Sequence, residues 1–158
     1  MSDTPTTAED RLAELDLKLP TAFPPAGLYQ PVKRSGRTLY VSGAVPFGAD
    51  ASTPVVGKVG CDLTVEQAQE AARITGLNLL AVLRDELGSL DEVAGIVKLF
   101  GMVNCAPGFT RTPEVINGCS QLLIDVFGER GRHARSAIGV AELPFGMAVE
   151  IELVAELV

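Results

Sequence analysis

The chain has 158 residues, of which 47% are hydrophobic and 21% are charged, and its formal net charge is −7. These values exclude a disordered or fibrous chain. They fit one globular domain whose core needs no disulfide or metal support. The negative charge opposes binding to a phosphate backbone, so we expect no affinity for nucleic acid.

No feature of the sequence indicates a membrane or a secretory route. Residues 1–10 are polar and acidic, without the basic start and apolar stretch of a signal peptide. The longest uncharged run, 99–110, is too short to cross a bilayer. Three cysteines without Cys-X-X-Cys spacing indicate reduced thiols in the cytoplasm. Because His133 is the single histidine, we expect no metal site.

The N-terminal residues 1–25 have the character of an extension to a domain of residues 26–158. Thr6 and Glu9 have capping-box spacing and predict a short helix over about 7–16. Three prolines then exclude regular structure and favour an extended segment: Pro20, Pro24 and Pro25.

A hairpin is predicted over 32–46, because Ser35-Gly36 has turn chemistry between β-branched and aromatic residues. A loop follows over 48–57, since this stretch is rich in small residues, Asp and Pro. A short strand is predicted around 55–59.

The clearest helix is predicted over 65–87. Thr64 and Gln67 form a capping box before it, and Gly88 ends it. Gly76 interrupts the helix at a cost of about 1 kcal/mol relative to Ala. We interpret that glycine as a point of close packing between the helix and a sheet.

A buried strand is predicted over 93–104, followed by a second helix. Thr112 is the expected N-cap of this helix, with Pro113 in its first position and Gly128 beyond its end. The remaining chain predicts a second hairpin, in which strands 136–143 and 147–157 flank a turn at 144–146. This order predicts an α+β domain with a mixed sheet and two helices on one face.

The last strand alternates apolar and acidic residues. Its apolar face is larger than two helices are expected to cover, and this predicts association into a homotrimer. The residues of that face are Val149, Ile151, Leu153 and Ala155.

Few residues have the spacing of catalytic motifs. Gly57 to Gly60 is too short for a phosphate loop. No Ser/His/Asp triad suggests itself, because His133 would have to be its only base. The unusual stretch is 132–140, where three potential cations precede an apolar strand. Arg135 in it is either an exposed surface arginine or a two-pronged clamp for a carboxylate. Glu150 lies on the predicted partner strand, either as an outward-facing charge or as a site residue, and it shares a face with Glu152.

Two blocks of sequence resemble the RidA/YjgF family. Residues 135–144, Arg-Ser-Ala-Ile-Gly-Val-Ala-Glu-Leu-Pro, and residues 149–152, Val-Glu-Ile-Glu, resemble its C-terminal signature. Residues 27–29, Gly-Leu-Tyr, followed by residues 39–43, Leu-Tyr-Val-Ser-Gly, resemble its N-terminal block. The resemblance covers about residues 26–158, and the N-terminal extension is similar to that of a longer subgroup.

The resemblance implies a chorismate-mutase-like fold that assembles as a homotrimer with ligand clefts between subunits. It also implies hydrolysis of enamines and imines, such as 2-aminoacrylate, to 2-oxo acids and ammonia, without a cofactor. The alternatives are a non-catalytic trimer that binds small carboxylate metabolites, and a ribonuclease. The acidic charge counts against the ribonuclease.

The resemblance also assigns residues. Arg135 matches the arginine that binds the substrate carboxylate, and Glu150 matches the glutamate that positions or activates the attacking water. Ala137 stands where the family often has a cysteine, and His133 where many relatives have proline. Four further positions match residues at the cleft: Tyr29, Ser42, Gly43 and Asn117.

Overall fold

The computed structural model describes residues 6–48 and 53–158. The strands in these ranges are β1 (Val32–Ser35), β2 (Thr38–Ala44), β3 (Val93–Asn104), β4 (Ala134–Val140) and β5 (Val149–Leu157). The helices are α1 (Ala8–Glu14), α2 (Val65–Leu87) and α3 (Thr112–Phe127). Short 3-10 turns lie at Leu90–Glu92, Gly128–Gly131 and Pro144–Gly146.

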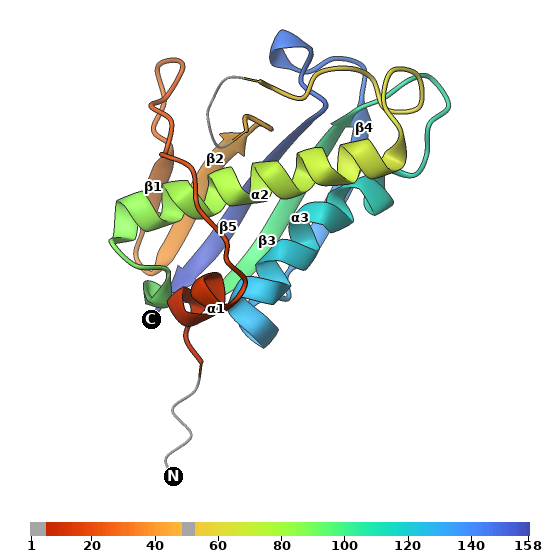
Figure 1. Cartoon of the computed structure of the whole chain (residues 1–158). Helices are drawn as coiled ribbons and strands as arrows, with labels where there is room; N and C mark the ends of the chain where they lie inside the picture. Colours follow the sequence, from red (N-terminus) through yellow and green to blue (C-terminus); the bar gives the residue numbers. More distant parts are fainter. Residues whose placement is uncertain (1–5, 49–52) are drawn as a thin grey trace.

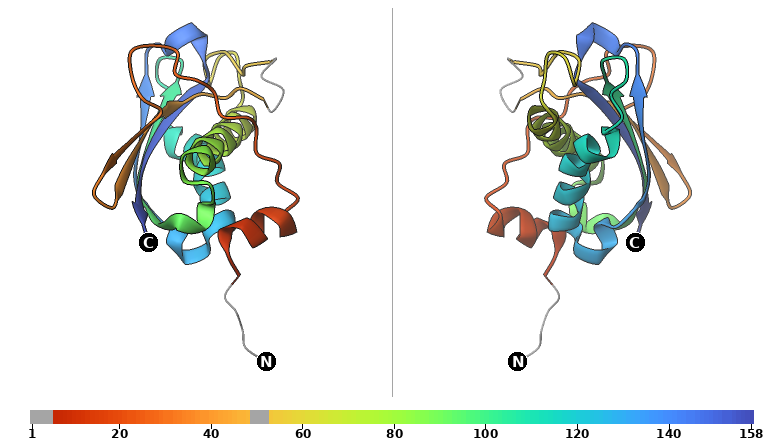
Figure 2. Two further views of the ribbon diagram at one scale, coloured as in Figure 1. Left: turned by 90° about the vertical axis from the view of Figure 1, so that its left-hand side faces the viewer. Right: turned by 90° about the vertical axis from the view of Figure 1, so that its right-hand side faces the viewer.

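The strands form one sheet in the order β1-β2-β5-β3-β4, and α2 and α3 lie side by side on one of its faces (Figure 1). The pairing of β3 with β4 is parallel and the other pairings are antiparallel. The fold is therefore α+β with a mixed sheet, as predicted. Turned by 90°, the molecule shows two layers, with no helix of the described ranges on the other face of the sheet (Figure 2).

Helix α2 begins and ends where the sequence predicts. The Thr64 hydroxyl accepts a hydrogen bond from the Gln67 backbone, and the Gln67 side chain accepts one from the Thr64 backbone. Gly88 ends the helix in the left-handed conformation, at φ 80°. Local capping chemistry alone thus fixes both ends of this helix.

Helix α1 is shorter than predicted and is capped one residue later. Thr7 is the N-cap and pairs with Asp10, so the box is not formed by Thr6 and Glu9. The Glu9 carboxylate, which does not take part in the capping box, accepts a hydrogen bond from the Leu90 backbone and forms a salt bridge with Arg84 near the end of α2. These contacts tie the N-terminal helix to the edge of the domain.

The predicted cap of α3 is wrong. Arg111 is the N-cap and makes no capping hydrogen bond through its side chain, while Thr112 is already in the helix. The Thr112 hydroxyl donates to the Ala137 carbonyl on β4 at 3.0 Å. The Thr112 hydroxyl therefore makes a tertiary hydrogen bond to β4 and does not cap its own helix. The predicted strand over 55–59 is also absent, because only isolated bridges form there.

The predicted C-terminal hairpin is wrong as well. β4 and β5 do not pair, because β3 lies between them and hydrogen-bonds to both. The strands follow one another in sequence with a short 3-10 turn between them, and sequence patterning alone favours pairing them directly. Instead the chain after β4 passes over the end of β3 to reach its other side.

The apolar face of β5 is already covered within the chain. Its four apolar residues are at most 2% exposed and belong to the core under the helices: Val149, Ile151, Leu153 and Ala155. The argument that this face drives assembly is therefore wrong. The sheet face without helices is the surface that a second subunit could cover.

The two long helices approach each other at glycines. A Cβ on Gly118 of α3 would overlap the backbone of Gln69 on α2, and a Cβ on Gly76 of α2 would lie 2.8 Å from the Leu122 side chain. The close packing expected at Gly76 is thus real, but its partner is α3 rather than the sheet. Any added side-chain atom at this crossing must separate the helices.

We predict that Gly118→Ala lowers the free energy of unfolding by about 1–3 kcal/mol, as expected for overpacking against fixed backbone. Helix propensity alone predicts the opposite sign, a gain of about 1 kcal/mol. Urea unfolding measures the difference, with Gly27→Ala as the control, because a Cβ there makes only ordinary contacts with Tyr29. A stabilised Gly118→Ala variant would contradict the packing described here.

Candidate functional site

Four of the predicted site residues line one open cleft. The cleft has a volume of about 590 Å³ and lies where β2 and β5 meet the segment before β1. Its floor is a bulge in β2 between Val41 and Ala44, where Ser42 and Gly43 together oppose the single residue Glu152 of β5. The predicted residues that line it are Tyr29, Ser42, Gly43 and Glu150.

The Glu150 carboxylate lies directly over Gly43. A Cβ on Gly43 would overlap Glu150 Oε1 and lie 3.0 Å from its Cδ, so a larger residue would displace the carboxylate. Partial burial, and then the charge of the neighbouring Glu152, raise the pKa of Glu150 above its usual value. A carboxylate with a raised pKa is a stronger base than an exposed one.

The other two predicted residues form a separate cluster beside α3. Arg135 on β4 donates from Nη1 to Asn117 Oδ1 at 2.8 Å and to Ser120 Oγ at 3.0 Å. Its Nη2 donates to the Pro113 carbonyl at 3.3 Å. Three acceptors on one helix therefore hold the guanidinium in a fixed orientation.

A second layer orients this cluster. His133 Nδ1 lies 2.7 Å from the Gly131 carbonyl, which can only accept, so Nδ1 carries the proton. The bare Nε2 then accepts from the Ser120 hydroxyl at 3.0 Å, while Ser120 Oγ accepts from Arg135. Burial is the largest cause that lowers the pKa of His133, and the positive charge of Arg135 adds to it. Neutral His133 is thus the form that fits this chain of hydrogen bonds.

Arg135 and Glu150 lie on opposite faces of the sheet. Arg135 is paired with Leu99, which is buried under the helices, whereas Glu150 is paired with Met102 on the other side of the pleat. The hairpin that was expected to bring the two residues together does not exist. Within one chain, β3 keeps the predicted carboxylate anchor apart from the predicted base.

Known proteins match this chain over most of its length. The family model described as "YjgF/chorismate_mutase-like, putative endoribonuclease" matches residues 9–157. Protein TCP17 of Trypanosoma cruzi is 46% identical over 147 residues, which are 92% of this chain and 91% of that protein. The chain belongs to the YjgF/RidA family.

Two solved structures resemble this chain along most of its length. Atu1372 of Agrobacterium tumefaciens, a protein of unknown function, is 42% identical with a TM-score of 0.88, covering 96% of this chain and 92% of its own. RidA of an Antarctic Psychrobacter is 25% identical with a TM-score of 0.59, covering 89% of this chain and 94% of its own. The chain therefore shares more of its structure with Atu1372 than with RidA.

Sequence reasoning missed Ser120 and Phe145. Ser120 follows Asn117 by one helical turn, so the spacing of two polar residues on one face of α3 was the available signal. Phe145 lies on the rim of the cleft, is 88% exposed and has a left-handed φ of 56°. An aromatic residue rarely adopts this φ, and the sequence carries no sign of it.

Among the described residues, no cysteine lines the cleft that holds Glu150. Ala137 replaces the cysteine that the family often carries, and burial raises the pKa of Cys119 to about 12, which keeps that thiol protonated.

Among residues 6–48 and 53–158, no group of His, Cys, Asp and Glu could hold a metal ion. In the same ranges, no helix is long and apolar enough to cross a membrane.

We predict that His133 titrates below its ordinary pKa of 6.5. Because the folded pKa lies below the unfolded one, stability from this residue is present above pH 6.5 and declines as the pH falls toward the folded value. Proton NMR follows the titration without overlap, since the chain has one histidine. Removing the nearby charge with Arg135→Gln should move the midpoint upward.

The control is Arg132→Gln, because Arg132 pairs with Glu129 and belongs to no part of the Arg135 cluster. A wild-type midpoint at or above 6.5 would contradict the buried, neutral His133. An equal shift in the two variants would show that the effect of Arg135 on His133 does not depend on its place in the hydrogen-bonded cluster.

Proposed function

We propose that this protein hydrolyses reactive imines of small 2-amino acids, in clefts that are completed by a second copy of the chain. The observation that carries the proposal is the Arg135 guanidinium, which three acceptors on α3 hold at the edge strand of the sheet. Holding the Arg135 side chain in one rotamer costs conformational entropy. This cost is explained if the guanidinium must bind a carboxylate in one orientation.

The hydrogen bonds of Arg135 leave one edge of its guanidinium available. Nη1 uses both of its protons and Nη2 uses one, in the bonds to Asn117, Ser120 and Pro113. Among the described residues, no hydrogen bond from Nε or from the second Nη2 proton is present. These two remaining donors are available for the oxygens of a carboxylate.

Glu150 supplies the second requirement, a base for water. Its carboxylate is half-buried over Gly43 and its pKa is raised, so it accepts a proton more readily than a surface glutamate. Tyr29 lies in the same cleft and can hydrogen-bond a bound substrate. The cleft therefore contains a base, Glu150, and a polar side chain, Tyr29. Arg135 of the same chain does not line this cleft.

A second subunit resolves the separation of Arg135 and Glu150. The sheet face without helices carries apolar side chains that one chain leaves exposed; Tyr40 is 52% and Ile138 is 44% exposed. Covering this face with another copy removes apolar area from water and brings edge strand β4 of one copy toward the cleft of the next. A homotrimer gives three such clefts with closed symmetry.

The chemistry needs few groups. The carbon of a protonated imine is electrophilic, so a water oriented by Glu150 adds to the C=NH2+ carbon, gives one proton to the carboxylate and forms a neutral carbinolamine. Glu150 then returns this proton to the amino nitrogen, the C–N bond breaks and ammonia leaves. The hydroxyl proton passes to the ammonia as the C=O bond forms, so the products are a 2-oxo acid and ammonium. Arg135 fixes the substrate through its carboxylate, and no cofactor takes part.

Two other functions remain as outcomes of the test. A binding protein for small carboxylates would use the same Arg135 without turnover. The family description includes an endoribonuclease, but a net charge of −7 opposes the approach of RNA. The free edge of a single arginine suits one carboxylate better than a nucleic-acid strand.

We predict that Arg135→Ala lowers kcat/KM for 2-aminoacrylate, generated in situ by a dehydratase, by at least about 10²-fold. Arg135→Lys keeps the charge but loses the two-pronged donor, so its loss should lie between the wild type and Ala. Glu150→Gln should lower kcat by about 10²–10⁴-fold with less effect on KM. The wild-type rate should also fall in acid as Glu150 is protonated, and Glu150→Gln should lack this fall.

Arg132→Ala and Glu156→Gln are the matched controls, because both residues are exposed and lie outside the cleft and the Arg135 cluster. Each variant is first checked for assembly by light scattering. Equal activity of wild type and Arg135→Ala would refute the assigned anchor. Binding of a small carboxylate through Arg135 without hydrolysis of any imine would replace the enzyme by the binding protein.

A further inference from the structure

The chain after β4 carries an aromatic residue onto the rim of the Glu150 cleft. Residues 141–147, here called the crossing segment, pass over the end of β3 and lead into β5, where Glu150 lies. Phe145 in this segment has a left-handed φ of 56°, which a bulky residue rarely adopts because it costs conformational free energy. Its ring is exposed, so packing within the chain does not offset this cost. The ring therefore indicates a contact with a molecule outside the chain.

The crossing segment is held in place by a buried asparagine and a lysine. Asn104 ends β3, and its Nδ2 donates to the Met147 carbonyl at 3.1 Å, while its Oδ1 accepts from Lys58 Nζ at 2.8 Å. The same ammonium group donates to the Ala141 carbonyl and forms a salt bridge with Glu142, with 3.4 Å between Nζ and Oε1. Both ends of the segment are thus fixed, and the aromatic ring between them stays on the rim.

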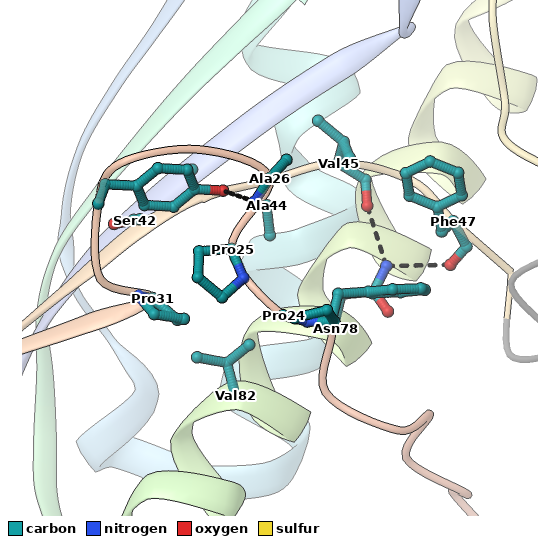
Figure 3. Close-up of a pocket in the computed structure, with 13 residues that line it drawn as sticks. Pro24, Pro25, Ala26, Pro31, Ser42, Ala44, Val45, Phe47, Asn78 and Val82 are labelled. Carbon is teal, nitrogen blue, oxygen red and sulfur yellow. Dashed lines mark hydrogen bonds between the residues drawn. The ribbon is translucent and has the colours of Figure 1, made fainter.

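A second apolar wall of the cleft follows β2. Val45 and Phe47 line the cleft, and both are held by Asn78 of α2, which is 4% exposed. Asn78 Nδ2 donates to their two carbonyls at 2.9 Å each (Figure 3). Because carbonyls can only accept, these bonds fix the orientation of the amide. Both apolar walls therefore have hydrogen-bonded supports within one chain.

The proposed reaction leaves one substituent of the substrate for this apolar surface. In the proposed function, on which this inference rests, the substrate carboxylate binds Arg135 of a second copy and water attacks beside Glu150. The imine nitrogen leaves as ammonia, so the remaining substituent of the reacting carbon is the side chain. Apart from Glu150 and Glu152, no described residue that lines the cleft is charged. The substrate side chain therefore contacts mostly apolar surface.

The size of the cleft favours a large side chain. Its volume of about 590 Å³ lies in the range of pockets that hold drug-sized ligands, roughly 300–1,000 Å³. The side chain of 2-aminoacrylate is a single carbon, so this substrate would leave most of the apolar wall in contact with water. A longer apolar side chain would remove that surface from water, which is favourable.

We propose that Phe145 selects the substrate of the Glu150 cleft, and that the preferred substrates are imines of amino acids with large apolar or aromatic side chains. The Phe145 ring packs against the substrate side chain, and the contacts of Lys58 and Asn104 hold the ring in that place. Arg135 and Glu150 act on the part that all such imines share, so they do not distinguish one side chain from another.

Substrate selectivity tests this proposal. The imines of phenylalanine and of alanine are generated in situ by an amino acid oxidase, and kcat/KM for hydrolysis is measured for each. The wild type should prefer the phenylalanine imine by at least about tenfold, and Phe145→Ala should reduce this preference by about tenfold. Leu15→Ala is the matched control, because Leu15 is an exposed apolar residue outside the cleft, and it should leave the preference unchanged.

Three results would overturn the role of Phe145 while the proposed hydrolysis stands. The first is an equal kcat/KM of the wild type for the two imines, and the second is an unchanged preference in Phe145→Ala. The third is a change of oligomeric state in Phe145→Ala, measured by light scattering, which would assign the ring to a contact between copies of the chain instead.

Binding of stable carboxylates separates this proposal from imine hydrolysis. Phenylpropanoate and propanoate are titrated into the wild type and into Phe145→Ala, and their affinities are compared by calorimetry. If no imine is hydrolysed but the wild type prefers phenylpropanoate through Phe145, the proposed hydrolysis fails and the selective role of Phe145 stands. If the wild type shows neither hydrolysis nor this preference, both proposals are overturned.

Discussion

The position of β3 between β4 and β5 is the constraint on which the functional interpretation depends. β3 pairs in parallel with β4 and antiparallel with β5, and the register puts Arg135 on the helix face and Glu150 on the face without helices. Two groups that the proposed chemistry needs together are thus kept apart by the pleat and by a whole strand. The same arrangement leaves β4 as an edge and one sheet face uncovered, which are the surfaces that a neighbouring copy of the chain can use.

Local chemistry explains which elements the sequence could predict. Helix α2 was predicted to the residue because Thr64, Gln67 and Gly88 act within one turn of its ends. Strand β3 was also predicted, since its long apolar run is bounded by polar segments. The C-terminal hairpin was wrong, because the choice between pairing β4 with β5 and inserting β3 is made by contacts far apart in sequence. The same reason applies to Thr112, whose hydroxyl bonds to β4 instead of capping its helix.

The candidate site could be predicted in its parts but not in its assembly. Motif resemblance pointed to Arg135 and Glu150, and the structure gathers Tyr29, Ser42 and Gly43 around the latter. The spacing of Ser120 from Asn117 was the only signal for the cluster of Arg135, and nothing in the sequence indicates that His133 extends it, because these contacts join α3 to the start of β4. The buried amide of Asn78 was hidden for a similar reason. An asparagine within a helix has an ordinary pattern, and only the fold shows that its oxygen is buried without a partner.

Subunit mixing tests most directly whether Arg135 and Glu150 act across a subunit boundary. Arg135→Ala and Glu150→Gln proteins, each inactive alone, are unfolded together in equal amounts and refolded. If each cleft takes Arg135 from one copy and Glu150 from the next, random mixing into trimers leaves about one quarter of the sites intact, and about one quarter of the wild-type activity returns. If both residues act from the same chain, no mixed assembly contains an intact site. A mixture as inactive as its components would therefore contradict a site shared between subunits.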